Sequence, residues 1–476
     1  MTMVLSAGEC ALSDANRGKV CVIGAGSAGI TAVKVLAERG IDVEAFELSD
    51  RVGGNWVWGN SNGVSAAYKS LHINTSRRRM EFSDFPMPDH LPEFARHDQI
   101  AQYFADYVDH FGFADRIRFR TGVTHVEPHS DGTFEVTLST GETRWYDAVL
   151  VANGHHWDPL LPEPMFPGAD SFTGELMHSH SYTEEAQLSG KRVVVVGMGN
   201  SGMDIAVDAS YYAEATHLSA RRGVHVIPKY VWGRPYDQIA GYEWVPGWVR
   251  WPLARRLMAA ATGPMERYGL PRPDHKFAQA HPTMSSRILD RLAHGAITPK
   301  PDIDHFDGDE VVFTDGSRTE ADLVVFCTGY KINFPFLEPD FLDPSSDNEI
   351  RLYKRLFHTQ TPGLYFVGLI QPLGAIMPIA ERQAELIADH MQGRYHLPKA
   401  SVMQREIDAH RRTIARRYVA SKRHTIQVDF DDYMRALRME RRRGARRTAG
   451  DTPVDRPLAS TPARVARESA ESETTE

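Results

Sequence analysis

Two apolar runs, each followed directly by glycines, dominate the hydrophobic pattern of the chain. They lie in Lys19–Gly29 (KVCVIGAGSAG) and Arg192–Gly202 (RVVVVGMGNSG). Residues that are apolar at successive positions, rather than at alternating ones, are typical of a strand buried on both faces of a parallel sheet. Apolar residues at helical spacing follow each run, so each segment predicts a strand, a tight turn and a helix.

Shorter patterns predict the remaining strands. Ile41–Glu47 follows the first predicted helix and completes a strand–helix–strand unit. Thr133–Asn153 alternates apolar and polar residues before ending in an apolar run, which predicts a hairpin or meander that feeds a further strand. Asp322–Gly329 (DLVVFCTG) and Gly363–Gly368 (GLYFVG) predict two more strands, and the proline-rich segment Trp157–Gly168 predicts a connector between the two units.

These elements predict an α/β protein with two Rossmann-like dinucleotide-binding domains, the second inserted into the first. The end of the chain is rich in Pro, Ser, Thr and Glu and cannot bury enough apolar surface to fold, so it is expected to be disordered. The predicted order is a leader at 1–18, the first part of the first domain at 19–168, the second domain at 169–324 with a helical insertion at 232–301, the second part of the first domain at 325–445, and the tail at 446–476.

Composition narrows the range of partners. The formal net charge is −8 and the sequence pI is near 6.2, so nothing favours nucleic acid or an anionic membrane as the partner. No stretch reaches the roughly 18 consecutive apolar residues of a membrane span. The N-terminus does not resemble a secretory signal, so a cytoplasmic protein that acts on a small molecule is expected.

The cysteines exclude dithiol redox chemistry. No two of Cys10, Cys21 and Cys327 have the C-x-x-C spacing of a dithiol centre or of a structural zinc site, which excludes the disulfide reductases. Cys21 and Cys327 each lie in an apolar run that ends in glycine, so we expect buried core residues rather than reactive thiols. The pair His155-His156 has no third ligand at a suitable spacing, so no metal site is predicted.

The first glycine motif is G-x-G-x-x-G, formed by Gly24, Gly26 and Gly29 between a predicted strand and a predicted helix, with Ser27 in the same turn. The glycines allow the backbone to approach a pyrophosphate closely, and the helix N-terminus faces that group with its N–H donors. Glu47 ends the second strand, where a carboxylate can accept both ribose hydroxyls. The alternative is a tight turn beside a solvated acid, which the combined placement of strand, helix and acid disfavours.

The second glycine motif repeats this context but lacks the acid. Its residues are Gly197, Gly199, Asn200, Ser201 and Gly202. The strand after the helix ends in Ser219-Ala220-Arg221-Arg222, and an arginine there accommodates a 2′-phosphate, which predicts NADPH in preference to NADH. The alternative is that Arg221 and Arg222 are solvated surface charges, because a strand end is located only to within about 2–4 residues.

Two dinucleotide sites in one chain imply hydride transfer from one cofactor to the other. A nicotinamide delivers two electrons and a flavin can pass them to O₂, so FAD and NADPH are the natural pair. Glu47 assigns FAD to the first glycine motif, and Arg221 with Ser219 assigns NADPH to the second.

Phe172–Tyr182 (FTGELMHSHSY) resembles the F-x-G-x-x-x-H-x-x-x-(Y/F) fingerprint of class B flavin monooxygenases, and it precedes the second glycine motif as it does in that family. Other segments are similar to the animal-type flavin-containing monooxygenases in particular, and the resemblance spans about residues 19 to 440. These segments are Val52–Trp56, Tyr68–Ser70, Asn74–Ser76, Phe82–Pro88, Cys327–Tyr330, Gly368–Pro378 and Thr425–Met434.

The resemblance implies a flavin-containing monooxygenase that uses NADPH and O₂ to oxygenate soft nucleophilic nitrogen or sulfur atoms, as in amines and thioethers, through a flavin 4a-hydroperoxide. By position in the family's motifs, Asn74 is the catalytic candidate beside the reactive edge of the flavin, and the cofactor contacts extend to Gly54, Trp56 and Gln371. The hydrophobic C-terminal anchor of the animal enzymes is missing, which favours a soluble form. The resemblance is compatible with a homodimer.

Several residues keep alternative interpretations. Asn74 could be a turn asparagine, and Asn200 could serve only to tolerate a left-handed backbone instead of binding NADP. His178 could be read as a general base, but a structural or conformational role in the linker is favoured because nothing places it within reach of a substrate.

Three other functions are weighed against N- or S-oxygenation. Baeyer–Villiger enzymes end the fingerprint in Trp followed by Pro or Asp, whereas Thr183 follows Tyr182, which disfavours ketone oxygenation. A flavin reductase or electron-transfer module would have no use for the fingerprint. A dinucleotide-sensing protein is the third alternative, disfavoured because the glycines, Glu47 and Arg221 are all in place.

Overall fold

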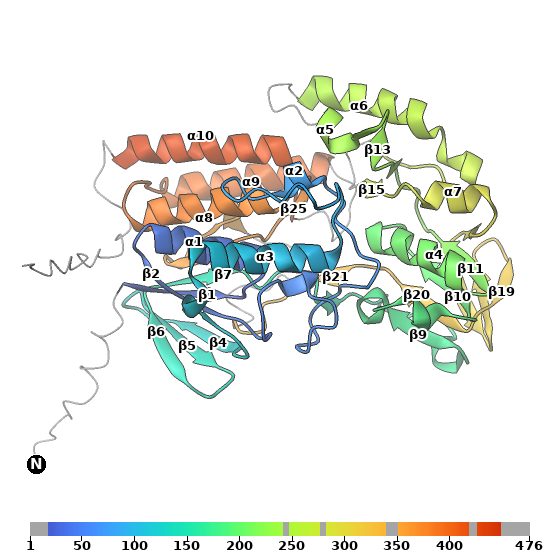
Figure 1. Cartoon of the computed structure of the whole chain (residues 1–476), viewed down its shortest axis with the longest axis horizontal. Coiled ribbons are helices and arrows are strands. Elements are labelled where there is room, and N and C mark those ends of the chain that lie inside the picture. Colours follow the sequence, from blue (N-terminus) through green and yellow to red (C-terminus); the bar gives the residue numbers. More distant parts are fainter. Residues whose placement is uncertain (1–17, 241–246, 277–281, 339–350, 418–425, 449–476) are drawn as a thin grey trace, which may run out of the picture.

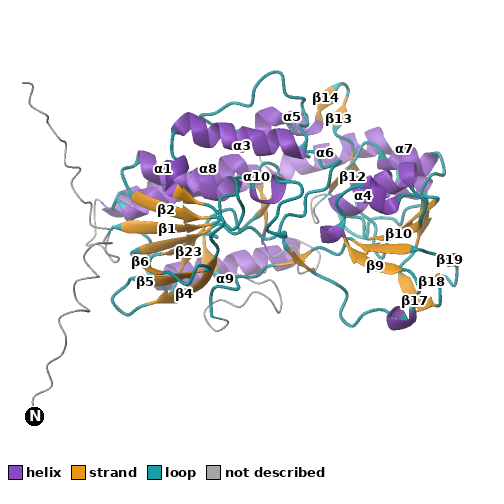
Figure 2. Cartoon of the chain, turned by 60° about the horizontal axis from the view of Figure 1, so that its bottom comes forward, coloured by secondary structure: helices purple, strands orange, loops and turns teal. Residues whose placement is uncertain are grey.

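The computed structural model describes residues 18–240, 247–276, 282–338, 351–417 and 426–448 (Figure 1). Two parallel-stranded sheets occupy opposite halves of the molecule, each with helices beside it (Figures 1 and 2). The expected leader and Cys10 lie outside the described residues, apart from Gly18.

The first sheet has seven strands in the order β22-β23-β24-β7-β1-β2-β3. Its centre is parallel, from β24 through β7, β1 and β2 to β3, while β22 and β23 join it in antiparallel fashion. The strands are β1 (Lys19–Ile23), β2 (Asp42–Phe46), β3 (Ile117–Arg118), β7 (Ala148–Val151), β22 (Leu352–Tyr353), β23 (Phe357–His358) and β24 (Leu364–Phe366).

The second sheet has five strands, all parallel, in the order β16-β11-β10-β20-β9. All of them lie between β7 and β22 in the sequence, so one unit is inserted into the other. The strands are β9 (Glu175–His178), β10 (Arg192–Val196), β11 (Ala215–Ser219), β16 (Thr298–Lys300) and β20 (Leu323–Phe326).

Each parallel sheet is covered by helices on one face and by a three-stranded antiparallel sheet on the other. Val20 and Val22 of β1 pack in the core under the helices, whereas Cys21 and Ile23 pack against the antiparallel sheet. The residues of β10 divide in the same way between two clusters. Burial on both faces is why neither strand alternates in sequence.

The antiparallel sheets are β4-β5-β6 on the first unit and β17-β18-β19 on the second. Their strands are β4 (Val123–Pro128), β5 (Phe134–Leu138), β6 (Thr143–Tyr146), β17 (Ile303–Asp307), β18 (Glu310–Phe313) and β19 (Arg318–Glu320). The hairpin predicted within Thr133–Asn153 is confirmed as β5 and β6, and β7 is the strand that it feeds.

Ten α-helices lie within the described residues. In the first unit α1 packs against α8 and α3, and α10 packs against α8; in the second, α4 packs against α7. They are α1 (Ser27–Glu38), α2 (Arg77–Met80), α3 (His97–Phe111), α4 (Asn200–Tyr212), α5 (Tyr236–Ala240), α6 (Gly247–Thr262), α7 (Ile288–Ala293), α8 (Met377–Met391), α9 (Ala400–Arg417) and α10 (Phe430–Thr448). Short 3₁₀ turns are η1 (Gly54–Trp56), η2 (Ala114–Arg116), η3 (Ala169–Ser171), η4 (Ser179–Ser181), η5 (Glu185–Leu188) and η6 (Met265–Tyr268).

Four two-stranded pairs complete the fold: β8 with β21, β12 with β15, β13 with β14, and β25 with β26. The first of these joins the segments that leave β7 and β20, so it is the crossing point between the units. The strands are β8 (Asp158–Pro159), β12 (Val226–Ile227), β13 (Tyr230–Val231), β14 (Arg234–Pro235), β15 (Thr283–Met284), β21 (Tyr330–Lys331), β25 (Gln371–Leu373) and β26 (Gln427–Asp429).

Three predicted boundaries are wrong. The boundary between residues 324 and 325 falls inside β20, which pairs with β10 and β9 and therefore belongs to the second sheet. The insertion 232–301 contains α5, α6 and α7, but also short strands, and its end forms β16 of the second sheet. Residues 446–448 of the expected tail continue α10, while 449–476 lie outside the described residues.

Candidate functional site

The first glycine loop is shaped by close backbone contacts that only glycine permits. Gly24 has a φ of +99°, and a Cβ there would lie 2.8 Å from the carbonyl oxygen of Ala152. A Cβ on Gly29 would lie 1.9 Å from the carbonyl oxygen of Gly24. These contacts pack the loop against the strand ends and the first turn of α1.

Gly26 and Gly54 form the open part of this loop. A Cβ on Gly26 would have only the Cα of Gly54 within 4 Å, at 3.7 Å, whereas a Cβ on Gly54 would lie 3.1 Å from the Cα of Gly26. The two bare backbones thus leave a shallow cradle that side chains would fill. A pyrophosphate needs this kind of close backbone approach, so the residues fit the flavin dinucleotide.

The N-terminus of α1 opens onto the same loop. Gly26 precedes the helix without a side-chain cap, and the N–H of Ile30 is bonded to Gly26 O at 3.0 Å. The N–H groups of Ser27, Ala28 and Gly29 come before this first helical bond, and the first turn carries no acidic residue. Such a terminus favours an anionic ligand through its N–H groups and the helix dipole.

Glu47 lies beside this loop, as expected. Its side chain is buried, and its two oxygens accept the N–H groups of Ala25 at 2.7 Å and Ser49 at 2.8 Å. Burial raises the pKa of Glu47, and the hydrogen bonds from Ser49 and Ala25 oppose that rise. The backbone of Leu48 also bonds to this carboxylate. A carboxylate has about four acceptor sites, so Glu47 can still accept a ribose hydroxyl.

The other residues expected near the flavin lie on three further segments. Trp56 ends η1, two residues after Gly54, and Gln371 begins β25. Asn74 is partly exposed, but its Oδ1 is buried and has no hydrogen-bond partner among the described residues. A buried oxygen of this kind requires a donor, which a bound ligand can supply.

One residue of this region was not singled out from the sequence. Gly368 has a φ of +76°, and a Cβ there would lie 2.7 Å from the Cβ of Ala28 in the first turn of α1. It therefore closes the glycine loop from the side of β24. The signal that could have identified it is the glycine that ends the apolar run GLYFVG.

The second glycine loop repeats the geometry of the first. Gly197 has a φ of +106°, and its Cβ would lie 2.9 Å from Cys327 O. A Cβ on Gly202 would lie 2.1 Å from Gly197 O, and Gly199 precedes α4 without a side-chain cap. The same backbone contacts therefore recur at both loops, so this loop also fits a dinucleotide.

Two of the residues expected to contact the cofactor at the second loop are already hydrogen-bonded to other residues of the protein. Asn200 accepts the N–H of Met284 through Oδ1 at 3.0 Å, so its Nδ2 is the group left for a cofactor. The hydroxyl of Ser219 donates to Pro301 O at 2.8 Å, and the side chain is buried. Ser201 lies in the first turn of α4. Cofactor contacts from these residues remain predictions.

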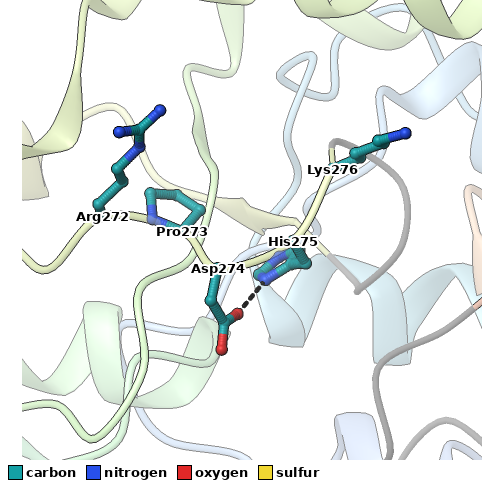
Figure 3. Close-up of a pocket in the computed structure, with 5 residues that line it drawn as sticks. All are labelled: Arg272, Pro273, Asp274, His275 and Lys276. Atoms are coloured by element: carbon teal, nitrogen blue, oxygen red, sulfur yellow. Dashed lines mark hydrogen bonds and ion pairs between the residues drawn. The ribbon is translucent and has the colours of Figure 1, made fainter.

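Arg221 and Arg222, just beyond β11, differ in their surroundings. Both side chains are exposed, but Arg222 Nε lies 3.0 Å from Asp274 Oδ2, whereas Arg221 has no ion pair with any described residue. Asp274 is one of the residues 272–276 that line an open hollow, together with Arg272 and Lys276 (Figure 3). The two arginines therefore differ in whether an acidic side chain lies beside them.

His178 has the environment of a structural residue. Its Nδ1 accepts the N–H of His180 at 3.0 Å, which fixes the turn at the end of β9. Burial lowers the pKa of His178 to about 4, and the nearby Gly329 backbone only partly opposes this shift. Because its Nδ1 lone pair accepts the His180 N–H and its pKa is lowered, His178 is a weak base that is poorly suited to take up a proton at neutral pH.

The cysteines are consistent with core positions. Cys21 is fully buried, while Cys327 is partly buried and packs against the core of the second unit. Burial raises the pKa of the Cys21 thiol strongly and that of Cys327 to about 12. Within the described ranges no three His, Cys, Asp or Glu side chains converge as metal ligands, and no helix there is long and apolar enough to cross a membrane.

Comparison with known proteins gives a consistent result along nearly the whole chain. Residues 17–442 match the family model described as flavin-binding monooxygenase-like. Flavin-containing monooxygenase 5 of Rattus norvegicus is 38% identical over 438 residues, which cover 88% of this chain and 82% of that protein. Dimethylaniline monooxygenase [N-oxide-forming] 2 of Macaca mulatta is 33% identical over 443 residues, with coverage of 89% and 82%.

Two solved structures share the mixed α/β fold. Steroid monooxygenase, oxidized and bound to NADP, superposes with a TM-score of 0.69 at 19% identity and covers 90% of this chain and 98% of its own. S-allyl-L-cysteine S-oxygenase from Allium sativum gives a TM-score of 0.67 at 24% identity, with coverage of 91% and 92%.

Proposed function

Since this chain belongs to the flavin-binding monooxygenase-like family, we propose that it oxygenates soft nucleophilic nitrogen or sulfur atoms, with FAD at the first glycine loop and NADPH at the second. Membership makes it a flavin-containing monooxygenase whose cofactors are FAD and NADPH and whose substrates are O₂ and a small molecule. The site assignment and the substrate class are the proposed part.

The assignment of cofactors rests on the opposite charge beside two loops of the same backbone geometry. Glu47 lies at the first loop and can accept ribose hydroxyls, but it would repel a 2′-phosphate. Arg221 lies at the end of the matching strand of the second unit and has no acidic partner among the described residues. A 2′-phosphate is therefore better accommodated at the second loop.

The overall reaction balances with one molecule of NADPH, which supplies two electrons, and one proton. A bound FAD would supply the redox chemistry that couples the two electrons of NADPH to the insertion of one atom of O₂ into the substrate, with the other atom released as water. The chain itself holds both dinucleotides, orients the substrate atom and excludes water from the reacting edge. Asn74, with its buried and unpartnered Oδ1, is the residue proposed beside that edge.

The substrate class rests on one observation, the end of the fingerprint. Tyr182 is followed by Thr183 and not by Pro or Asp, and the Tyr182 ring is buried with its hydroxyl bonded to Asp208. The relative named for N-oxide formation, 33% identical, supports the proposal.

Product analysis tests the proposed function. The purified holoenzyme is supplied with NADPH, O₂ and, in separate reactions, trimethylamine, thioanisole or cyclohexanone. From trimethylamine we expect the N-oxide and from thioanisole the sulfoxide, each in an amount nearly equal to the NADPH consumed in that reaction. From cyclohexanone we expect little lactone. Lactone as the main product would establish ketone oxygenation instead. NADPH consumption that yields only H₂O₂ in every reaction would indicate a flavin reductase.

A further inference from the structure

The segment that carries Asn74 belongs to the first unit but is held largely by the second. Residues 68–76 lie between η1 and α2, and the second unit bonds to them at five points. Each of the residues Tyr68, Lys69, Ser70, Ile73 and Ser76 is bonded in this way, and the bonds include Tyr68 OH to Asp204 Oδ2 at 2.7 Å, Lys69 N to Thr183 O at 2.8 Å, Ser70 Oγ to Asp208 Oδ2 at 2.5 Å, Lys229 Nζ to Ile73 O at 3.1 Å, and Ser76 N to Asp237 Oδ2 at 2.7 Å. Lys69 Nζ also bonds to Glu184 and Glu185, and Gln238 Nε2 to Ser76 Oγ.

Asp208 is the point where three segments meet. Its Oδ2 accepts the hydroxyl of Ser70 at 2.5 Å and the hydroxyl of Tyr182 at 2.9 Å. Asp208 lies on α4, the helix that starts in the second glycine loop. One carboxylate oxygen therefore connects the Asn74 segment, the last residue of the fingerprint and the helix that follows the NADPH loop.

Buried aromatic rings surround this carboxylate. Tyr182 is 1% exposed and Tyr68 is 4% exposed, and their ring centroids lie 5.7 Å apart. Both rings pack in the core of the second unit although Tyr68 belongs to the first. Hydrogen bonds to a charged acceptor among buried rings are stronger than exposed neutral ones.

Small displacements of this segment matter because Asn74 is only four residues beyond Ser70. Four residues span at most about 14 Å even when fully extended. The first unit also holds this stretch, through the bonds from His97 N to Leu71 O at 3.0 Å and from Ile73 N to Ala95 O at 2.9 Å, so the position of Asn74 depends on both units. A misplacement of about 1 Å in a reacting group can cost roughly 10²-fold in rate.

We propose that Asp208 is a positioning residue, which places Asn74 by accepting hydrogen bonds from Ser70 and Tyr182. The proposal rests on the proposed function, since it assumes that Asn74 lies beside the reacting edge of the flavin. It also gives a physical role to the terminal tyrosine of the fingerprint, because the Tyr182 hydroxyl fixes the carboxylate that holds the Asn74 segment. The placement of Asn74 then depends on the position of α4.

Amide hydrogen exchange of residues 68–76 in the FAD-bound enzyme tests the contact directly. Asp208→Ala should accelerate exchange in this segment by roughly 10- to 100-fold, because two bonds to a charged acceptor are lost. Asp208→Asn keeps one acceptor oxygen and should give a smaller increase. Tyr107→Phe is the matched control, since it removes a buried hydroxyl that has no partner among the described residues. Unchanged exchange in a folded Asp208→Ala protein overturns the proposal.

The coupling of NADPH consumption to product separates positioning from simple destabilisation. In Asp208→Ala and in Tyr182→Phe we expect less product and more H₂O₂ per NADPH, with FAD content and the KM for NADPH retained. If Asp208→Ala does not fold, Ser70→Ala and Tyr182→Phe replace it, and their combined effect on exchange should be less than the product of the single effects. Faster exchange with unchanged coupling overturns the positioning role.

Asn74→Ala distinguishes failure of this proposal from failure of the proposed function. It should lower the coupling without accelerating exchange elsewhere in residues 68–76. If Asn74→Ala leaves the coupling unchanged, the proposed role of Asn74 is wrong, and with it the assumption on which the positioning role of Asp208 depends. If Asn74→Ala uncouples the enzyme but Asp208→Ala does not, only the inference about Asp208 fails.

Discussion

Arg221 and Arg222 are neighbours in the sequence, yet the structure gives them different capacities to bind an anion. Arg222 is paired with Asp274, which comes from a segment about fifty residues further along the chain. Arg221 has no such partner among the described residues. A guanidinium without an acidic partner can bind a phosphate without first breaking an ion pair. Arg221 is therefore the better candidate for the 2′-phosphate.

We predict that Arg221→Ala weakens NADPH binding by about 1–3 kcal/mol, through the loss of charge-assisted bonds to the phosphate. Binding of NADH, which lacks the 2′-phosphate, should change little. Rapid-reaction titration of flavin reduction with each nucleotide measures both constants. Arg222→Ala is the matched control and should have the smaller effect. Equal losses for NADPH and NADH would contradict the assigned role.

For single residues, the chemistry of each candidate could be predicted from the sequence, but the partners that surround it could not. The glycines, Glu47 and Arg221 follow from local motifs, and the structure places Glu47 directly on the first loop. The use of the Ser219 hydroxyl by Pro301 depends on a partner 82 positions away. No local pattern contains that information.

At the scale of elements, two strand–turn–helix units have the same architecture and the same close contacts. A Cβ at Gly29 or Gly202 would lie 1.9 or 2.1 Å from the carbonyl oxygen of the first glycine in its own loop. Neither oxygen can move without shifting the backbone that faces the ligand. The same substitution, glycine to alanine, can therefore be made at both positions, and each should affect a different cofactor.

We predict that Gly29→Ala yields a colourless protein without FAD, whereas Gly202→Ala retains FAD but is not reduced by NADPH. Absorbance of the purified proteins and their anaerobic reduction measure the two effects. Gly40→Ala is the control: its φ is +70°, but its Cβ would meet no atom within 4 Å, so it should lose some stability and keep both cofactors. Loss of FAD in Gly202→Ala alone would reverse the assignment of the loops.

Element boundaries show where a sequence pattern stops being informative. DLVVFCTG and GLYFVG are both short apolar runs that end in glycine, but β20 pairs with β10 and β24 pairs with β7. Which sheet a strand joins is decided by its partners and not by its own residues. The two-residue strands within 226–235 were not predicted, because two residues are too few for a periodicity.

At the scale of the whole molecule, the two units meet through polar groups as well as through the β8–β21 pair. Tyr68 and Asp204 are separated by 136 residues, and the bond between them cannot be read from either segment. The insertion of one unit into the other was predictable from the order of the motifs. The side chains that join the units were not, since their contacts exist only after both sheets have formed.

The junction should make stability depend on pH through Asp204. Burial raises the pKa of Asp204 to about 6, although the Tyr68 hydroxyl and the charge of Lys229 oppose the rise; Asp208 and Arg287 also face it. In the unfolded chain an aspartate has a pKa near 3.9. Between about pH 4 and pH 6 the folded protein therefore binds more protons than the unfolded chain, so this group's contribution to stability falls as pH rises through that window.

Asp204→Asn removes this titration while keeping an oxygen that can accept the Tyr68 hydroxyl. The unfolding free energy of the variant minus that of the wild type should be roughly 1–3 kcal/mol higher at pH 7 than at pH 4. The reason is that the wild type loses the contribution of the Asp204 titration over this range and the variant has no such contribution to lose. Denaturant unfolding at the two pH values, without added NADPH, measures the difference. Asp170→Asn, at an exposed position, should follow the wild type at both values. A variant that instead lost stability relative to the wild type on going from pH 4 to pH 7 would show that the junction needs the carboxylate in its charged form, through Lys229 and Arg287, and that burial is not its dominant influence.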